Sequence, residues 1–216
     1  MNNSGNNRSC ALTGLLAVVL WVVRLILLTH NGPADHATGG EILAWYRSET
    51  NTILFGGWFF MLGCLSFVTF LAGIRVRLAD TLGTSSQLPG LALAGAAIAG
   101  VCGMLTAAVD VGGAIDKNDI GPSTAAAFHH FLDVFFISAE LAAILPVGVV
   151  AIAAWRTRIL PRSWAAFSAL VAVVLIIGPI GWLGLIFGVP IWTIGTSLFV
   201  LLGSPAPARA TAAATA

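Results

Sequence analysis

Charged residues are scarce in this chain: they make up 9% of its 216 residues, whereas 58% are hydrophobic. Ten basic and nine acidic residues leave a net charge of +1. Binding of nucleic acid relies on a basic surface, so this composition excludes that partner. A mean hydropathy of +0.94 also excludes an ordinary soluble domain. The composition therefore predicts that the bilayer is the surrounding solvent.

Cysteine is also rare, with three residues in the whole chain. Cys10 falls in the predicted cytoplasmic tail, whereas Cys64 and Cys102 fall within apolar runs. This placement excludes a disulfide framework, and no cysteine or histidine spacing is typical of a metal site. There is no HExxH motif either. We predict neither a metal site nor a cofactor, and we expect the cysteines to act as small buried hydrophobes.

Long apolar runs dominate what is present. Each run has about 19 to 24 residues, enough to cross a hydrocarbon core of roughly 30 Å. The six runs lie near residues 11–29, 52–74, 91–110, 131–154, 164–182 and 184–202. The sequence therefore predicts an all-α protein, a bundle of six transmembrane helices within residues 11–203.

Basic residues alternate along these runs and indicate the orientation. Seven of the ten fall where a chain of six crossings returns to the same side: Arg8, Arg75, Arg77, Arg156, Arg158, Arg162 and Arg209. Positively charged loops remain in the cytoplasm. We therefore expect a multi-pass protein of the cytoplasmic membrane with both termini inside, including an N-terminal tail (1–10) and a disordered C-terminal tail (204–216).

Several local patterns predict how the spans are arranged. Small residues recur every four positions in the run 91–110, which favours close packing on two sides and a central place for this helix. Pro190 should kink the last span, and a turn is expected near Gly178–Gly181. Trp45 and Tyr46 in the first outer loop are typical of anchors at the membrane interface.

One basic residue departs from the charge pattern. Arg24 lies inside the first span, roughly 8 Å from its outer end at 1.5 Å per residue. Glu140 lies at a similar depth in the fourth span and has the opposite charge, while Asp110 ends the third span at the outer face. Ionisable groups within spans are costly and usually face the interior of the bundle. An Arg24–Glu140 ion pair is therefore one prediction.

The fourth span carries further polar residues toward the same side. His129, Asp133 and Glu140 are separated by four and seven residues and so share one helix face, with His130 rotated off it. This pattern predicts an outward-facing polar pocket between the first, third and fourth spans. The candidate ligand-binding residues are Arg24, Asp110, His129, His130, Asp133 and Glu140.

Three interpretations of this pocket remain open. It can bind a small or amphiphilic ligand or carry protons, since histidine and a desolvated carboxylate are suitable proton carriers. Alternatively, Glu140 or Asp133 acts as a general acid in an intramembrane enzyme that uses a hydrophobic, polyprenyl-like substrate. In the third interpretation the Arg24–Glu140 pair is purely structural in a membrane scaffold. The sequence does not determine the oligomeric state.

Two segments resemble a known group of proteins. Residues 43–78 (LAWYRSETNTILFGGWFFMLGCLSFVTFLAGIRVRL) combine an aromatic-Arg-Ser entry, a Gly-rich span and an Arg-x-Arg exit, and residues 159–175 (ILPRSWAAFSALVAVVL) begin with a basic Leu-Pro-Arg turn. Together they resemble a family of small polytopic membrane proteins of GC-rich bacteria that carries a domain of unknown function. The resemblance implies a six-helix bundle in the cytoplasmic membrane and no particular activity.

Overall fold

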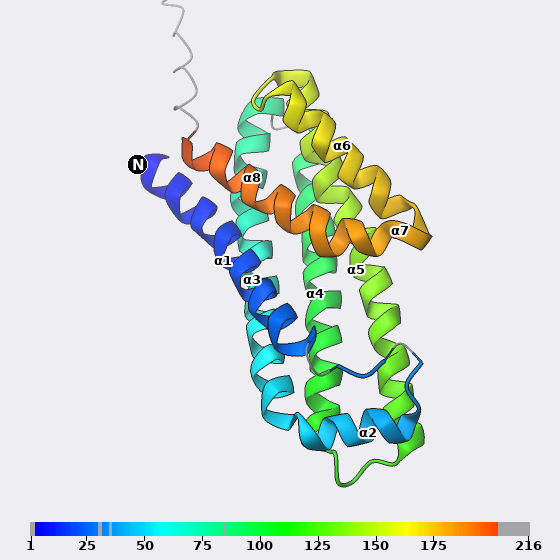
Figure 1. The fold of residues 1–216 in the computed structure, drawn as a ribbon. Coiled ribbons are helices and arrows are strands. Elements are labelled where there is room, and N and C mark those ends of the chain that lie inside the picture. Colours follow the sequence, from blue (N-terminus) through cyan, green and yellow to red (C-terminus); the bar gives the residue numbers. More distant parts are fainter. Residues whose placement is uncertain (1–2, 30–31, 35, 84, 203–216) are drawn as a thin grey trace, which may run out of the picture.

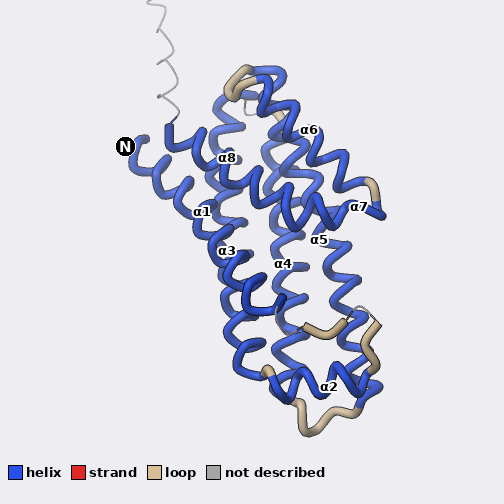
Figure 2. The backbone as a smooth tube through the Cα atoms, viewed as in Figure 1, coloured by secondary structure: helices blue, strands red, loops and turns tan. Residues whose placement is uncertain are grey.

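The chain folds into helices joined by short loops (Figures 1 and 2). The computed structural model describes residues 3–29, 32–34, 36–83 and 85–202, and this part of the chain contains no strand. The elements are α1 (Asn3–Thr29), α2 (Gly39–Ser48), α3 (Thr50–Leu82), α4 (Leu88–Ile115), α5 (Pro122–Thr157), α6 (Arg162–Ile176), α7 (Gly178–Leu183), the π-helical segment η1 (Gly184–Gly188) and α8 (Val189–Leu202). The predicted C-terminal tail 204–216 lies outside the described residues.

Three long antiparallel helices form the centre of the bundle, with α4 between α3 and α5 (Figure 1). Small residues let the backbones approach each other. A Cβ atom added to Gly95 would lie 2.5 Å from Cβ of Leu145 on α5, and one added to Gly100 would lie 2.6 Å from Val68 on α3. The prediction that small residues place the run 91–110 at the centre is confirmed.

The first helix is longer than the apolar run predicts. α1 begins at Asn3, so most of residues 1–10, predicted as a tail, is helical. Cys10 is part of this helix and packs against Gly73 of α3, and its thiol lies 3.4 Å from the carbonyl oxygen of Phe70 as a hydrogen-bond donor. The assignment of Cys10 to a tail is therefore corrected: this cysteine helps to seat α1 on α3.

The last two spans divide at a different residue from the predicted one. α6 ends at Ile176, not near 182, and after a turn at Ile177 the chain continues as one apolar helix over Gly178–Leu202. Pro179 explains the break, because it has no N–H to continue the bonding of α6, its ring would crowd the carbonyl of Leu175, and it suits the first turn of the next helix. The turn thus lies just before the predicted glycines, which begin the last helix.

The short helix α2 crosses the end of the bundle formed by the start of α3, the end of α4 and the start of α5 (Figure 1). Thr38 and Glu41 form a capping box at its N-terminus. The Thr38 backbone N–H and hydroxyl donate to the Glu41 carboxylate, which holds the pKa of Glu41 below its usual value. We call this end of the molecule the α2 end.

The apolar face of α2 is buried within the protein and not in lipid. Ile42, Leu43, Trp45 and Tyr46 pack with Ala114 and other residues in a small core of their own. Tyr46 has no exposed surface and Trp45 is 9% exposed. The prediction that these two aromatic residues anchor the chain at the membrane interface is therefore wrong, because the ends of α4 and α5 cover them.

Large apolar side chains cover the outside of the bundle. On α1, Leu12, Leu16, Val19 and Ile26 are 48–60% exposed along one face. Five helices of the described residues are long and apolar enough to cross a membrane: Arg8–Leu28, Thr50–Leu82, Leu88–Ile115, Pro122–Thr157 and Gly178–Leu202. Exposed apolar surface of this extent requires a nonpolar surrounding. The protein is thus built as a helical membrane protein.

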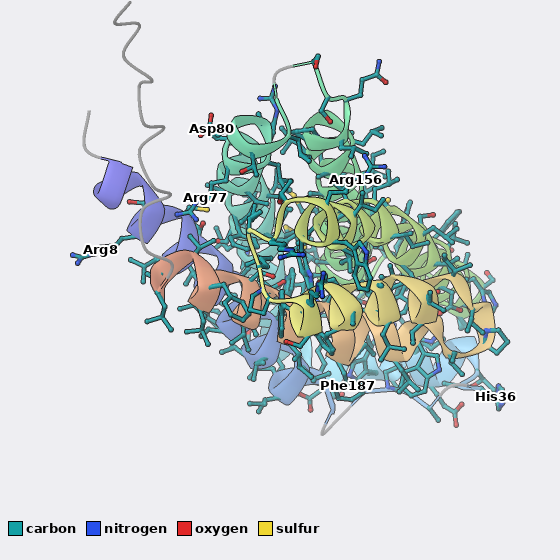
Figure 3. The ribbon with its side chains drawn as sticks, turned by 90° about the horizontal axis from the view of Figure 1, so that it is seen from above. Arg8, His36, Arg77, Asp80, Arg156 and Phe187 are labelled. Carbon is teal, nitrogen blue, oxygen red and sulfur yellow. The ribbon has the colours of Figure 1, made fainter. Side chains whose placement is uncertain are left out.

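The predicted inner arginines gather at the end of the bundle opposite α2, which we call the arginine end. Among the described residues these are Arg8, Arg75, Arg77, Arg156, Arg158 and Arg162. Figure 3 looks onto this end and shows Arg8, Arg77 and Arg156 on separate helices. Because they are spread around the bundle, they do not build a single anion site. Arg209 lies outside the described residues.

Candidate functional site

A buried ion pair joins α1 to α4. Nη2 of Arg24 donates a hydrogen bond to Oδ2 of Asp110 at 2.8 Å, and the two side chains are 11% and 4% exposed. The guanidinium carbon of Arg24 also lies 4.8 Å from the centre of the Phe60 ring on α3, in a cation–π contact. Buried charges require such partners, so Arg24 is held in the bundle from two sides.

Two consecutive glycines of α3 lie near this pair. A Cβ atom on Gly57 would overlap with the Val111 side chain on α4, so the missing side chain lets α3 and α4 approach each other. A Cβ atom on Gly56 would lie 4.0 Å from Cγ of Arg24, which is an ordinary van der Waals contact. Gly57 is therefore the glycine on which the close packing beside Asp110 depends.

The predicted Arg24–Glu140 pair is wrong. Glu140 is 4% exposed and lies against the start of the last helix, where a Cβ atom on Gly181 would collide with its Oε1 atom. The prediction relied on depth along the span, which matched Glu140 to Arg24 and placed Asp110 at the outer face, whereas the structure pairs Arg24 with Asp110. The rotation of the helices decides between the two acids, because Glu140 faces the last helix and Asp110 faces α1.

A group of polar atoms surrounds Asp110 on the side facing α2 and α5. The Tyr46 ring lies against Gly113, one turn along α4 from Asp110, and His129 of α5 lies close enough to Asp110 for an electrostatic interaction. Burial, together with the nearby Asp110 carboxylate, raises the pKa of the Tyr46 hydroxyl. We call Asp110, Tyr46 and His129 the Asp110 group.

Each member of the Asp110 group has a buried polar atom without a partner. These atoms are Oδ1 of Asp110, the hydroxyl of Tyr46 and Nδ1 of His129, and none has a hydrogen bond within the described part of the chain. Nη1 of Arg24 is also buried and has no hydrogen bond within the described part of the chain. Buried polar atoms usually have partners, and each one without costs about 1–3 kcal/mol. So many unpartnered polar atoms close together favour a functional site over an ion pair that only holds α1 against α4.

On its other side, Arg24 borders a pocket of about 510 Å³ whose walls come from α1, α3, α4, α5, η1 and α8. Most of the lining is apolar, including Trp21, Phe67 and Phe136, and Arg24 is the one charged residue in it. Phe60 and Thr106 are the lining residues of α3 and α4 nearest the α2 end. The pocket therefore has a polar part toward the α2 end and an apolar part toward the arginine end.

The pocket opens sideways, between α1 and the last helix. Val22 and Leu25 of α1 and Phe187 and Ile191 of the last helix line it and are 42–53% exposed. Figure 1 shows α1 and α8 diverging from the arginine end, and Figure 3 shows Phe187 at the periphery of the molecule. The opening therefore lies on the apolar outside of the bundle.

A local irregularity in the last helix shapes one wall of the pocket. The backbone N–H of Val189 bonds to the carbonyl of Gly184, five residues back, so residues 184–188 form a π-helical turn. Pro190 follows directly; it has no N–H, and its ring crowds the carbonyl four residues earlier. The predicted distortion at Pro190 is thus present as a widened turn, which places Leu185 and Phe187 in the lining. Such π-turns are frequent at functional sites.

The structure divides the predicted site residues into three sets. Arg24, Asp110 and His129 come together, Glu140 lies apart beside Gly181, and His130 and Asp133 are exposed on the outside of α5. Neither catalytic candidate, Glu140 or Asp133, lines the pocket. The predicted pocket between the first, third and fourth spans is thus corrected: the polar part is smaller, and α3 and the last helix form much of the wall.

Sequence reasoning missed Tyr46 and Phe60 as site residues. Phe60 is one of twelve phenylalanines and has no distinguishing pattern. Tyr46 is the single tyrosine of the chain, and it stands in an amphipathic helix directly before the third helix. A tyrosine on the apolar face of such a helix could have indicated a buried polar contact, but it is equally typical of an anchor at the membrane interface.

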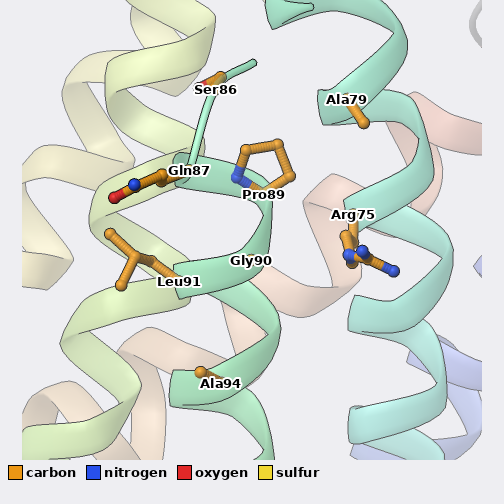
Figure 4. A pocket seen from close by; sticks show the side chains of 8 residues that line it. All are labelled: Arg75, Ala79, Ser86, Gln87, Pro89, Gly90, Leu91 and Ala94. Atoms are coloured by element: carbon orange, nitrogen blue, oxygen red, sulfur yellow. The ribbon is translucent and has the colours of Figure 1, made fainter. Parts of the chain in front are cut away.

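A second cleft, of about 540 Å³, lies at the arginine end between α3 and α4 (Figure 4). Arg75 and Ala79 of α3 line one side of it, and Pro89 of α4 lies opposite them. Among the described residues, its lining contains one charged side chain and no buried polar atom without a partner. The pocket beside Arg24 is therefore the stronger candidate.

Comparison with known proteins adds no assignment. No protein-family model, no curated protein and no solved structure matches this chain significantly. The class that the fold and the pocket define is a helical membrane protein with a buried ion pair beside a pocket open to the side.

Proposed function

We propose that this protein binds one amphiphilic molecule, drawn from the bilayer, in the pocket beside Arg24. The observation that carries the proposal is the composition of the lining: apolar walls with a single charged residue toward one end. A volume of about 510 Å³ falls within the range of pockets that enclose small organic ligands, roughly 300–1,000 Å³. An amphiphile would place its polar head near Arg24 and Thr106 and its chain among the aromatic residues.

The same lining favours binding over the other two interpretations. A general acid must reach the substrate, and neither Glu140 nor Asp133 borders the pocket. A purely structural pair between Arg24 and Asp110 would leave the pocket and the unpartnered atoms around it without a role. Asp110 and His129, the candidate proton carriers, lie near the proposed position of the polar head of the ligand.

We further propose six passes, with α6 as a short pass, and both termini in the cytoplasm. α6 has 15 residues and would span about 22 Å. The first described helix begins and the last described helix ends at the arginine end, and basic residues favour the cytoplasmic side. This arrangement, in the cytoplasmic membrane of a GC-rich bacterium, is also what the resemblance of residues 43–78 and 159–175 implies.

Native mass spectrometry tests the proposed binding. The protein is released from its own membrane in a mild detergent, and we expect one added mass that tandem fragmentation identifies as an amphiphile. Ala139→Phe fills the pocket from α5 and should abolish the added mass. Ala108→Phe, an equal enlargement at an exposed position of α4, should retain it. Equal occupancy in both variants would show that the bound molecule lies elsewhere and would refute the proposal.

A further inference from the structure

We infer that the head of the pocket ligand is an anion and that the protein takes up one proton when this anion binds, on the Asp110 group. This inference rests on the proposed binding of an amphiphile in the pocket. The inference specifies the charge on the head of the ligand and names the protein group that neutralises this charge. Four observations support it: the orientation of the Arg24 pair, its buried unpartnered atoms, the isolation of the site from other charges, and the position of the pocket.

The donors beside the pocket favour an acceptor group. Nη2 of Arg24 is bonded to Asp110, but Nη1 is buried and has no partner within the described residues. The indole N–H of Trp21, another lining residue, is also buried and has the Cys64 thiol, a weak acceptor, as its hydrogen-bond neighbour. Both atoms donate and neither accepts. Hydrogen bonds from a guanidinium to an ionised oxygen are roughly twice as strong as neutral ones, so a carboxylate, phosphate or sulfonate head fits best.

Charge balance then requires a proton. Arg24 and Asp110 together are neutral, and an anion bound beside them would leave one uncompensated negative charge in a nonpolar site. Uncompensated buried charge is strongly unfavourable, and titratable groups respond by changing their protonation. One proton from water, added to Oδ1 of Asp110, restores neutrality. No covalent bond of the ligand is broken, and its head then shares Arg24 with a neutral acid.

The Asp110 group can receive this proton because its acceptors are unpartnered. Oδ1 of Asp110 and Nδ1 of His129 are both buried and without a hydrogen bond in the described chain, and the Tyr46 hydroxyl can donate or accept between them. Among the described residues, the titratable groups that face Asp110 are Arg24 from α1, Tyr46 from α2 and His129 from α5, and α3 contributes Cys64 near Arg24. Lys117 is directed away, with Nζ bonded to the hydroxyl of Thr50.

The experiment compares two probes with the same chain: dodecyl sulfonate, which stays ionised at all working pH values, and dodecanol, which is neutral. Full-length protein is placed in nanodiscs of phosphatidylcholine, and binding to the pocket is the part of the calorimetric signal that Ala139→Phe removes. If one proton is taken up, sulfonate affinity should rise about tenfold for each unit of falling pH across the titration window, whereas dodecanol affinity should stay constant. A pH indicator in weak buffer should register about one proton absorbed per sulfonate bound.

Two variants locate the proton. Asp110→Asn should bind sulfonate at high pH as tightly as the wild type does at low pH, without proton uptake. Asp133→Asn, which changes an exposed carboxylate of α5, should leave the pH dependence unchanged. If Asp110→Asn does not fold, the pH-indicator measurement of proton uptake by the wild-type protein still tests the inference. Sulfonate binding without pH dependence or proton uptake would overturn the inference.

The outcomes separate the inference from the proposed function. If dodecanol binds as well as sulfonate at every pH, the pocket accepts amphiphiles and the anionic head is refuted. If neither probe gives a signal that Ala139→Phe removes, both proposals fail. Adding phosphatidylglycerol to the nanodiscs identifies the source of the anion. Loss of sulfonate binding would assign the pocket to a two-chain anionic lipid, whereas retained binding would assign it to a single-chain anion.

Discussion

Arg24 and Asp110 lie 86 residues apart in sequence and 2.8 Å apart in space, and their ion pair joins α1 to the central helix α4. Arg24 is the one arginine that lies within an apolar run, far from the arginine end. Its partner, Asp110, lies on α4 near the pocket, α2 and α5. Arg24, the arginine that departs from the charge pattern, therefore lies in a polar part of the protein interior.

A double-mutant cycle measures this pair. Arg24→Gln and Asp110→Asn should each lower the free energy of unfolding by about 3–5 kcal/mol, because each leaves the other charge buried and unpaired. The double variant should lose much less than the sum of the two. Equilibrium unfolding in mixed detergent micelles gives the values.

Glu140 provides the control for that cycle. Arg24→Gln combined with Glu140→Gln should be additive within about 0.5 kcal/mol, because Glu140 lies against Gly181 and not against Arg24. A larger coupling of Arg24 with Glu140 than with Asp110 would contradict the observed packing.

The single tyrosine gives a spectroscopic test of the Asp110 group. Burial and the Asp110 carboxylate raise the pKa of Tyr46 above the ordinary value of about 10. The folded protein should therefore show no tyrosinate absorbance at pH values where a free tyrosine has ionised. Since the unfolded chain loses this proton first, stability should fall as the pH rises above about 10.

Tyr46→Phe is the matched variant for this test. It should remove the part of the alkaline loss of stability that tyrosine ionisation causes, while the unfolding curve near neutral pH keeps its shape. Tyrosinate absorbance that appears at the ordinary pKa in folded protein would show that Tyr46 is exposed, contrary to the structure.

Gly181 tests the placement of Glu140. Gly181→Ala should lower the free energy of unfolding by about 1–3 kcal/mol, because the added methyl group collides with the buried carboxylate. The same change combined with Glu140→Ala should cost less, since the obstacle is gone. Gly148→Ala on α5 has open space around its Cβ position and should be neutral or stabilising by about 0.5–1 kcal/mol. Equal losses at both glycines would contradict this arrangement.

Cysteine labelling tests the orientation. In a variant without the three native cysteines, His36→Cys and Lys117→Cys at the α2 end should react with an impermeant maleimide in intact cells. Arg77→Cys and Arg158→Cys at the arginine end should react only after permeabilisation. The reverse pattern would place the arginine end outside and refute the proposed topology.

The helical, apolar character of the molecule and the central place of α4 follow from the sequence, because helix period, span length and small-residue spacing are local properties. The ends of helices were less predictable. Cys10 belongs to α1 and Ile176 ends α6, because packing on α3 and the Gly178–Pro179 step override the hydropathy profile. For the site, Arg24, Asp110 and His129 were identified, whereas Tyr46 was assigned to the membrane interface.

The sequence by itself determined that one arginine lies inside a span, and that a buried guanidinium needs an acid close by. By depth it favoured Glu140 over Asp110, which ends the third span at the outer face. The tertiary structure decided for Asp110, because the partner depends on the rotation of α4 and α5 and on the close approach of α3 and α4 that Gly57 permits. The pocket is likewise tertiary in origin: α1 and the last helix diverge over α4, and no local pattern encodes the space between them.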